Sequence, residues 1–455
     1  MPASTFDREI EQRVNDALWD GAMTRQAVIG SGALGSVSVA FRQSFGDVPL
    51  TVVADTNTFA AAGRQVQEQL AGSLAGASEP FVFTDPKLYA EYSYVDQLRG
   101  FLSKSDAIAV AVGSGTINDL VKLASGELGR PYMSVATAAS MDGYTSFGAS
   151  VTRDGYKQTL PCPAPQAVVV DLDVLSVAPE RLNAAGYADL LAKVPAGGDW
   201  IVADALSVEP IEPRAWSLVQ SRLKEWLRDP AAVRRGDRNA LAGLIEGLIM
   251  TGLGMQYIGT TRPASGAEHQ FSHLWDMQHH THNGAAPMHG EKVGIGSIAV
   301  AAVYEQVLQR SVDDILTDET HVRERWPSWE SIETATRANF ADPLVADQVV
   351  AQQLGKHVSA EELVARLKRL RSSWPELQDR LREQLFTAEE TRRLLIDVGA
   401  PATPEEIGIS RDRLYESHRI AQQIRNRYTV LDLVNQAGWW DTCVESLFQQ
   451  GGVWA

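Results

Sequence analysis

The stretch AVAVGSGTINDLVKLA, residues 109–124, joins an uninterrupted apolar segment to a helical segment through a loop of small residues. A strand that is buried on both faces of a parallel sheet reads as such an apolar run. The loop, residues 113–116, lets backbone N–H groups face a phosphate, and the helix start adds a favourable dipole. The stretch therefore predicts a parallel α/β fold with an anion-binding loop at the end of one strand.

The same alternation of apolar segments and helical patterns extends from residue 1 to about residue 180. Residues 59–72, FAAAGRQVQEQLAG, are typical of the helical patterns between the apolar segments. Alternation of this kind is the signature of a doubly wound sheet. We predict a Rossmann-like α/β domain over residues 1–180, with strands at 26–32, 50–56, 80–85, 107–115, 131–137 and 167–173.

The character of the chain changes at about residue 181. Long amphipathic patterns such as ALAGLIEGLIMTGLGMQYI, residues 240–258, replace the β-branched runs. Thr387 and Glu390 form the pattern of a capping box, and Thr403 precedes a proline in the first helical position. We predict an all-α domain over residues 181–455.

The charge of the chain limits its partners. The sequence has 41 basic and 57 acidic residues among 455, which gives a net charge of −16. A nucleic acid or an anionic membrane surface as the main partner is disfavoured, because phosphate groups favour a basic surface. A small anionic substrate stays possible, since a single pocket can be locally positive.

The two cysteines, Cys162 and Cys443, are far apart in the sequence. They can form neither a disulfide framework nor a cysteine-type zinc site, so a reducing, cytoplasmic setting is expected. The N-terminus lacks the pattern of a signal peptide. The apolar run IGSIAVAAVY near residue 300 is too short to span a bilayer, and we expect no membrane insertion.

Two glycine loops are alternative sites for a dinucleotide. Residues 30–35, GSGALG, follow one predicted strand, and Asp55 ends the next strand at the spacing of a dinucleotide fingerprint. The loop at 113–116 has equally favourable chemistry, and the first loop can also be a tight turn without a ligand. A third loop of small residues, 136–146, follows another strand and carries two side chains that could face a polyol, Asp142 and Ser146.

Six of the nine histidines lie between residues 265 and 292. His269 and His273 are four positions apart and share one face of a helix, and His289 follows in MHGEKVGIG. A catalytic zinc site takes three protein ligands, often two histidines and a carboxylate. The candidate carboxylates are Asp189, Glu268 and Glu291, whereas a polar loop outside the site accounts for His279, His280 and His282.

Six motifs follow one another along the chain: VGSGTINDLVK, SVATAASMDGYTS, GYADLLAKVPAGGDW, RPASGAEHQFSHLWD, MHGEKVGIG and IRNRYTVLDL. Their order makes a specific resemblance, which covers residues 25–300 and, weakly, 400–435. Together they resemble the bacterial branch of the sn-glycerol-1-phosphate dehydrogenases, within the superfamily of iron-type (group III) alcohol dehydrogenases and dehydroquinate synthase-like enzymes. The resemblance implies that superfamily's fold, an N-terminal Rossmann-like α/β domain followed by an all-α domain.

The resemblance implies a cofactor site and chooses between the glycine loops. It assigns NAD(H), or alternatively NADP(H), to the loop at 113–116 and leaves GSGALG as a structural turn. Asp55 would contact the adenosine ribose; a carboxylate there favours NAD, because it would repel a 2′-phosphate. The cofactor-binding residues implied are Asp55, Gly113, Gly115, Thr116, Ile117, Asn118, Asp119, Thr137, Ala138, Ala139, Ser140 and Ser146.

The resemblance also implies the metal and substrate ligands. The metal triad, which is also the catalytic set, corresponds to Asp189, His269 and His289, with zinc or nickel as the ion. Asp142 and His273 correspond to substrate-contacting positions, and Asp189 is a further candidate for contact with the substrate. From its charge and position we add Arg262 as a partner for a substrate phosphate.

The implied reaction is the reversible, metal-dependent, NAD(P)H-linked reduction of dihydroxyacetone phosphate to sn-glycerol 1-phosphate, a step of phospholipid metabolism. Three alternatives stay open: a dehydrogenase of another polyol or polyol phosphate, a dehydroquinate synthase-like sugar-phosphate cyclase, and a binding protein without redox chemistry. The family implies a homodimer. The segment between His273 and His289 is longer than is usual in the family, which predicts altered access for the substrate.

Overall fold

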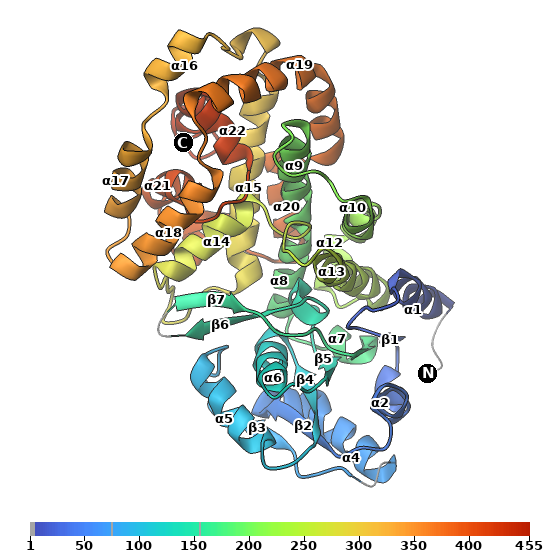
Figure 1. The fold of residues 1–455 in the computed structure, drawn as a ribbon. Helices are drawn as coiled ribbons and strands as arrows, with labels where there is room; N and C mark the ends of the chain where they lie inside the picture. Colours follow the sequence, from blue (N-terminus) through green and yellow to red (C-terminus); the bar gives the residue numbers. More distant parts are fainter. Residues whose placement is uncertain (1–4, 74–75, 154–155) are drawn as a thin grey trace. The chain divides into compact units, whose positions relative to one another are not determined.

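The computed structural model of the chain describes residues 5–73, 76–153 and 156–455. They form two units (Figure 1), each with its own core. The predicted domains, a cofactor domain over 1–180 and a metal- and substrate-binding domain over 181–455, are defined by their ligands and stay a prediction. The first unit comprises Met1–Leu190, Pro213–Ala264 and Asp397–Ala400, and the second comprises Leu191–Glu212, Ser265–Ile396 and Pro401–Ala455.

A six-stranded parallel sheet lies at the centre of the first unit, in the order β1-β8-β5-β4-β2-β3. Each strand lies at one of the six positions predicted from the apolar segments. The α/β fold class is confirmed by this sheet and by the helices beside it. The strands are β1 (Gln26–Gly30), β2 (Leu50–Asp55), β3 (Phe81–Phe83), β4 (Ile108–Gly113), β5 (Tyr132–Ala136) and β8 (Ala167–Asp171).

Helices cover both faces of the sheet, because alternate residues of the central strands are apolar on both sides. Val52 and Val110 belong to a core cluster with α2 and α4, whereas Val53 and Ala111 belong to a cluster with α5 and α6. The helices in and around the sheet are α1 (Thr5–Ala17), α2 (Val37–Phe45), α3 (Thr56–Thr58), α4 (Arg64–Ser73), α5 (Tyr92–Leu102), α6 (Gly115–Glu127), α7 (Leu172–Ser176) and α8 (Glu180–Leu191).

A two-stranded antiparallel hairpin, which the sequence analysis did not predict, follows β5. Its strands are β6 (Ala149–Arg153) and β7 (Tyr156–Leu160). Both strands mix polar with apolar residues and are short, so neither gives the continuous apolar signal of the buried strands. The hairpin packs beside α5 and α6 of the first unit.

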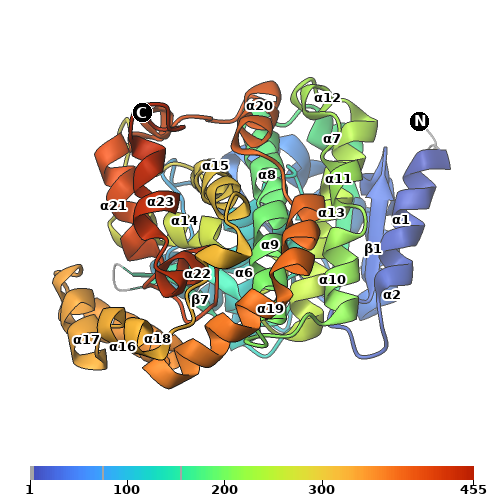
Figure 2. The same ribbon diagram turned by 90° about the horizontal axis from the view of Figure 1, so that it is seen from above.

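One long helix, α13 (Arg238–Ile258), forms the core of a helical layer in the first unit, with α10 (Pro213–Gln220), α11 (Leu223–Trp226) and α12 (Pro230–Arg234). Figure 2 shows α10 and α13 side by side, with α1 along the same layer. Among the described residues, α13 is the single helix long and apolar enough to cross a membrane, and 83% of its most apolar window is buried inside the protein. Its composition is therefore that of a core helix.

The second unit is helical throughout its described elements, as predicted for this part of the chain. Its centre is α9 (Lys193–Ala205), which packs against α14 (Ala267–Met277), α15 (His289–Leu308) and α19 (Ala360–Gln384). The remaining helices surround these and are α16 (Glu319–Arg325), α17 (Trp329–Ala338), α18 (Pro343–Lys356), α20 (Ala388–Val398), α21 (Arg411–Ala421), α22 (Val430–Ala437) and α23 (Trp440–Cys443).

Candidate active site

The loop after β4 is shaped for a close approach to the start of α6. A Cβ atom at Gly113 would lie 2.5 Å from the Ile117 side chain, and one at Gly115 would lie 3.2 Å from Met141. Only glycine therefore fits at Gly113 without a shift of its neighbours. The Ser114 side chain does not cap the helix start. The first N–H groups of a helix have no partner within the helix, so this end of α6 is a possible anion-binding site.

The competing loop after β1 is filled by the protein itself. The Asp171 carboxylate, at the end of β8, accepts hydrogen bonds from the N–H groups of Gly32 and Leu34, both at 3.0 Å. The Asp7 carboxylate accepts from the Ser31 N–H, also at 3.0 Å. Two carboxylates thus occupy the donors that a pyrophosphate would need, which agrees with the interpretation of GSGALG as a structural turn.

Asp55 lies at the end of β2, as predicted, and caps the short helix α3. Its Oδ1 accepts from the N–H groups of Asn57 and Thr58 at 2.8 and 2.9 Å. The Thr58 hydroxyl in turn accepts from the Asp55 N–H. This capping box fixes the carboxylate at the carboxyl edge of the sheet, where ligands of open α/β sheets bind.

Helix α8 packs against the loop after β5 that contains residues 137–140. The Ala139 N–H donates to the Asn183 side chain at 3.0 Å. The backbone of Gly186 lies so close that a Cβ atom there would be 1.8 Å from the Ala139 carbonyl oxygen. The Asp142 N–H donates to Oδ2 of Asp189 at 3.0 Å, so the loop also orients a predicted metal ligand.

Lys122 fixes the next part of that loop from the side of α6. Its ammonium group is fully buried and donates to the carbonyl oxygens of Gly143, Ser146 and Gly148 at 2.7, 3.0 and 3.2 Å. Burial lowers the pKa of Lys122, whereas the charge of Asp119 acts to raise it. The lysine therefore has a structural role that the sequence analysis did not identify.

Several predicted cofactor residues are engaged within the protein. The Asn118 side chain accepts from the hydroxyls of Tyr132 and Ser134, at 3.2 and 3.1 Å, and so faces the sheet. The Asp119 carboxylate accepts from the Ser150 N–H at 3.3 Å. Internal bonds also hold Thr137 to the β4 loop through its N–H and the Gly113 carbonyl, Ser140 to the Tyr144 hydroxyl, and Ser146 to the Gly143 carbonyl.

Three imidazoles gather in the second unit. His269 and His273 lie on one face of α14, as their spacing predicts, and His289 is the first residue of α15. The ring centroid of His269 is 5.1 Å from that of His289 and 6.3 Å from that of His273. Packing of α14 on α15 thus unites histidines from two motifs.

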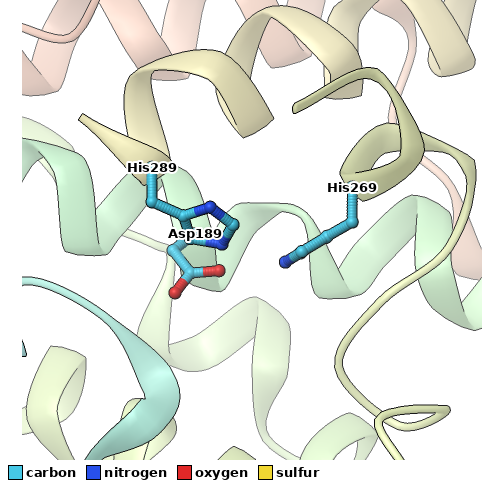
Figure 3. A group of neighbouring side chains, drawn as sticks. All are labelled: Asp189, His269 and His289. Carbon is cyan, nitrogen blue, oxygen red and sulfur yellow. The ribbon is translucent and has the colours of Figure 1, made fainter. Parts of the chain in front are cut away.

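The predicted triad of Asp189, His269 and His289 can hold a metal ion. One ligand atom from each residue lies within 4.8 Å of the others, and Asp189 is fully buried. Figure 3 shows both imidazole rings turned toward the Asp189 carboxylate. Two imidazole nitrogens and one carboxylate oxygen form the donor set that catalytic zinc sites use, with a position left for substrate.

Glu268 and Glu291, the other candidate carboxylates, have different roles. Oε1 of Glu268 lies 2.8 Å from Nδ1 of His269, within hydrogen-bond distance. Glu291 accepts from the Met288 N–H at 2.8 Å and caps the start of α15. Arg262, the predicted phosphate partner, is fully buried in the first unit, so its guanidinium presents no surface to solvent.

The other three histidines of the cluster lie outside the triad. His280 accepts from Arg413 at Nδ1, 2.8 Å away, and donates from Nε2 to the Ile407 carbonyl at 2.6 Å. Burial, followed by the charge of Arg413, lowers the pKa of His280. His279 is exposed, and His282 packs against Gly408. His280 is therefore a structural residue of the loop rather than a solvated one.

Asp199 is a further residue that the sequence analysis did not single out. It is fully buried on α9 and accepts from the Ala267 N–H at 2.7 Å, the Tyr304 hydroxyl at 2.6 Å and the Val430 N–H at 2.8 Å. It thus ties the first turn of α14 to α15 and α22. Its position in the motif GYADLLAKVPAGGDW was a signal, but its partners are too remote in sequence to be inferred.

Solved structures share the fold of this chain. A probable glycerol dehydrogenase from Sinorhizobium meliloti aligns with a TM-score of 0.58 and 18% identity, over 91% of this chain and 96% of that one. Glycerol dehydrogenase from Schizosaccharomyces pombe aligns with a TM-score of 0.55 and 15% identity, over 93% and 91%. At these identities the likeness concerns the fold alone.

Sequence comparisons identify the family. The model of the iron-containing alcohol dehydrogenases matches residues 28–179. Glycerol-1-phosphate dehydrogenase [NAD(P)+] from Halalkalibacterium halodurans is 36% identical over 58% of this chain and 67% of its own length. The protein of that name from Pyrococcus furiosus is 34% identical over 62% and 78%. The chain therefore belongs to the glycerol-1-phosphate dehydrogenase family of the iron-type alcohol dehydrogenase superfamily.

Proposed function

We propose that the protein catalyses the reversible NAD(P)H-linked reduction of dihydroxyacetone phosphate to sn-glycerol 1-phosphate. The observation that carries the proposal is the Asp189, His269 and His289 triad in a chain whose relatives are named glycerol-1-phosphate dehydrogenase [NAD(P)+]. Oxidation of the secondary alcohol of glycerol 1-phosphate gives dihydroxyacetone phosphate, so the two compounds are the two sides of one reaction.

The cofactor would lie along the carboxyl edge of the sheet in the first unit. The open N–H groups at the start of α6 would bind its pyrophosphate, since a helix start favours an anion. Asp55, already fixed by its capping box, would accept a hydrogen bond from a ribose hydroxyl. NAD(P)H would supply the hydride, while the residues of the chain orient it.

The triad would hold a divalent metal. When bound, this ion supplies Lewis-acid polarisation of the ketone oxygen and stabilises the charge that develops there, which is worth several kcal/mol. Asp142 would fix the orientation of Asp189 through its N–H group. His273, on the same face of α14 as His269, would hydrogen-bond the substrate.

Some remaining parts of the proposal rest on the family resemblance. They are zinc or nickel as the ion, a homodimer and a role in phospholipid metabolism. Three further parts rest on the residues themselves: NAD as the preferred cofactor on the Asp55 carboxylate, Arg262 as the phosphate partner on its charge and position, and a cytoplasmic location on the two separated cysteines. Elemental analysis and light scattering on the purified protein test the ion and the dimer directly.

The test of the proposed reaction is NADH oxidation by the metal-replete protein with dihydroxyacetone phosphate or with dihydroxyacetone. Turnover with the phosphorylated ketone, and little with dihydroxyacetone, is expected. His269→Ala should abolish turnover and metal binding together, whereas the matched control His279→Ala, an exposed residue outside the triad, should retain both. Phosphate release without net NADH consumption would indicate a cyclase and contradict the proposal.

A further inference from the structure

Both histidines of the triad are held at Nδ1 by side chains of α14. Nδ1 of His269 lies 2.8 Å from Oε1 of Glu268, and Nδ1 of His289 lies 3.4 Å from the Ser272 hydroxyl. Glu268 and Ser272 are both fully buried. Since a neutral imidazole has one donor and one acceptor nitrogen, bonds at Nδ1 decide what Nε2 can do.

The Glu268 carboxylate acts as an acceptor. Its Oε1 also accepts from the Gly266 N–H at 2.6 Å, so the same oxygen receives two bonds. The hydrogen between Glu268 and His269 therefore belongs to Nδ1, which leaves the lone pair of the neutral ring at Nε2. That nitrogen is the one a metal ion would bind.

The backbone around Glu268 has little freedom to move. A Cβ atom at Gly296 of α15 would lie 2.4 Å from the Glu268 carbonyl oxygen, so the two helices touch backbone to backbone there. A Cβ atom at Gly266 would lie 2.5 Å from Asp199 and 2.8 Å from Oε2 of Glu268. The Ala267 N–H is bonded to Asp199. The carboxylate is thus set in place before any ion binds.

The burial of Glu268 has no evident structural compensation at its second oxygen. Among the described residues, Oε2 of Glu268 has no hydrogen-bond partner although it is buried. A buried carboxylate is costly unless charge or hydrogen bonds offset it. A divalent cation beside His269 would offset it, because Asp189 and Glu268 together would then balance the charge of the ion.

We propose that Glu268 is a positioning residue for the metal: it fixes the Nδ1–H tautomer of His269 and strengthens Nε2 as a ligand. Ser272 gives the weaker, uncharged equivalent for His289. This inference rests on the proposed metal site. In other metal sites, a carboxylate often accepts a hydrogen bond from the non-ligating nitrogen of a metal-bound histidine. Replacing such a carboxylate typically lowers the metal affinity by roughly 10- to 100-fold.

The first test measures Zn²⁺ affinity by competition with a chelator, for the native protein and for Glu268→Gln. The variant should bind roughly 10- to 100-fold more weakly, and Ser272→Ala should bind only a few-fold more weakly. Glu305→Gln is the matched control: Glu305 is on α15 about 24 Å along the helix from His289 and accepts from the Ala388 N–H. Its Zn²⁺ affinity should stay native.

The outcomes separate this inference from the proposed function. Equal Zn²⁺ affinity of the native protein and Glu268→Gln would overturn the inference and leave the metal site intact. If the native protein binds no Zn²⁺ or Ni²⁺, the proposed metal site itself is wrong. A second measurement needs no folded variant at Glu268: nitrogen NMR of the metal-free native protein should show His269 with hydrogen on Nδ1, and hydrogen on Nε2 would contradict the proposal.

Discussion

At the scale of single residues, spacing predicted the histidines but not the buried carboxylates that hold the surrounding backbone in place. His269 and His273 lie on one helix face because they are four positions apart, and this is visible in the sequence. Asp171 and Asp199 bind partners more than 60 residues away, as the pairs with Gly32 and Ala267 show. Contacts of this kind depend on the tertiary fold, so the sequence alone could not reveal them.

A buried histidine outside the site should control the acid stability of the protein. His418 is fully buried between the rings of Phe271 and Phe448 and bonds the Leu414 carbonyl through Nδ1. Burial lowers the pKa of His418 from 6.5 to about 4. As the pH falls, the unfolded state therefore takes up a proton at a higher pH than the folded state does. The free energy of unfolding should have its full value above about pH 6.5 and fall by about 3 kcal/mol in total as the pH drops toward 4.

Urea unfolding between pH 4 and pH 7 measures this effect. His418→Phe keeps an aromatic ring between Phe271 and Phe448 and should flatten that part of the stability profile. His321→Ala, at an exposed position on α16, is the control and should leave the slope unchanged. An equal slope for the native protein and His418→Phe would show that another group is responsible.

At the scale of elements, the strands of the parallel sheet were predictable and the antiparallel hairpin was not. The six apolar segments correspond to β1, β2, β3, β4, β5 and β8, because burial between two helical layers demands continuous apolar sequence. The capping box at Thr387 begins α20, as predicted. Thr403 instead precedes a short 3-10 helix, which ends at Gly408 in the left-handed conformation.

The contact between α8 and the loop after β5 should be sensitive to one methyl group. Gly186→Ala would place a Cβ atom 1.8 Å from the Ala139 carbonyl, and the loop would have to move. We expect a loss of roughly 1–3 kcal/mol in the free energy of unfolding, together with weaker NADH binding. Urea unfolding and NADH fluorescence titration measure the two effects.

Gly100→Ala is the control for this prediction. Gly100 is exposed on α5, and a Cβ atom there would meet nothing within 4 Å. The added methyl group should stabilise the helix by up to about 1 kcal/mol and leave NADH binding unchanged. Native NADH affinity in Gly186→Ala would mean that α8 does not set the shape of the cofactor loop.

At the scale of the whole molecule, the order of fold classes along the chain was predictable, but the grouping of helices was not. Strand-helix alternation followed by long helical patterns indicates an α/β part and an α part. Helices α10 to α13, within 213–264, nevertheless group with the first unit. Their amphipathic patterns indicate that one face of each helix is buried, but they do not identify the element against which that face packs.

The candidate metal site likewise combines residues from three motifs that are separated in the sequence. Asp189, His269 and His289 come from three helices, and resemblance to a family supplied the carboxylate that spacing left open among three candidates. The bonds of Asp142 and Glu268 then explain how two of the proposed ligands are oriented. The proposed function requires that this triad holds a metal needed for the reduction of dihydroxyacetone phosphate.

The most direct measurement is the rate of NADH oxidation with dihydroxyacetone phosphate by the native protein, the chelator-treated protein and the chelated protein after Zn²⁺ or Ni²⁺ is restored, with chiral analysis of the product. Activity should be lost on chelation and recovered with the metal, and the product should be sn-glycerol 1-phosphate. Undiminished turnover in protein shown to be free of metal, or formation of the opposite enantiomer, would contradict the proposed function.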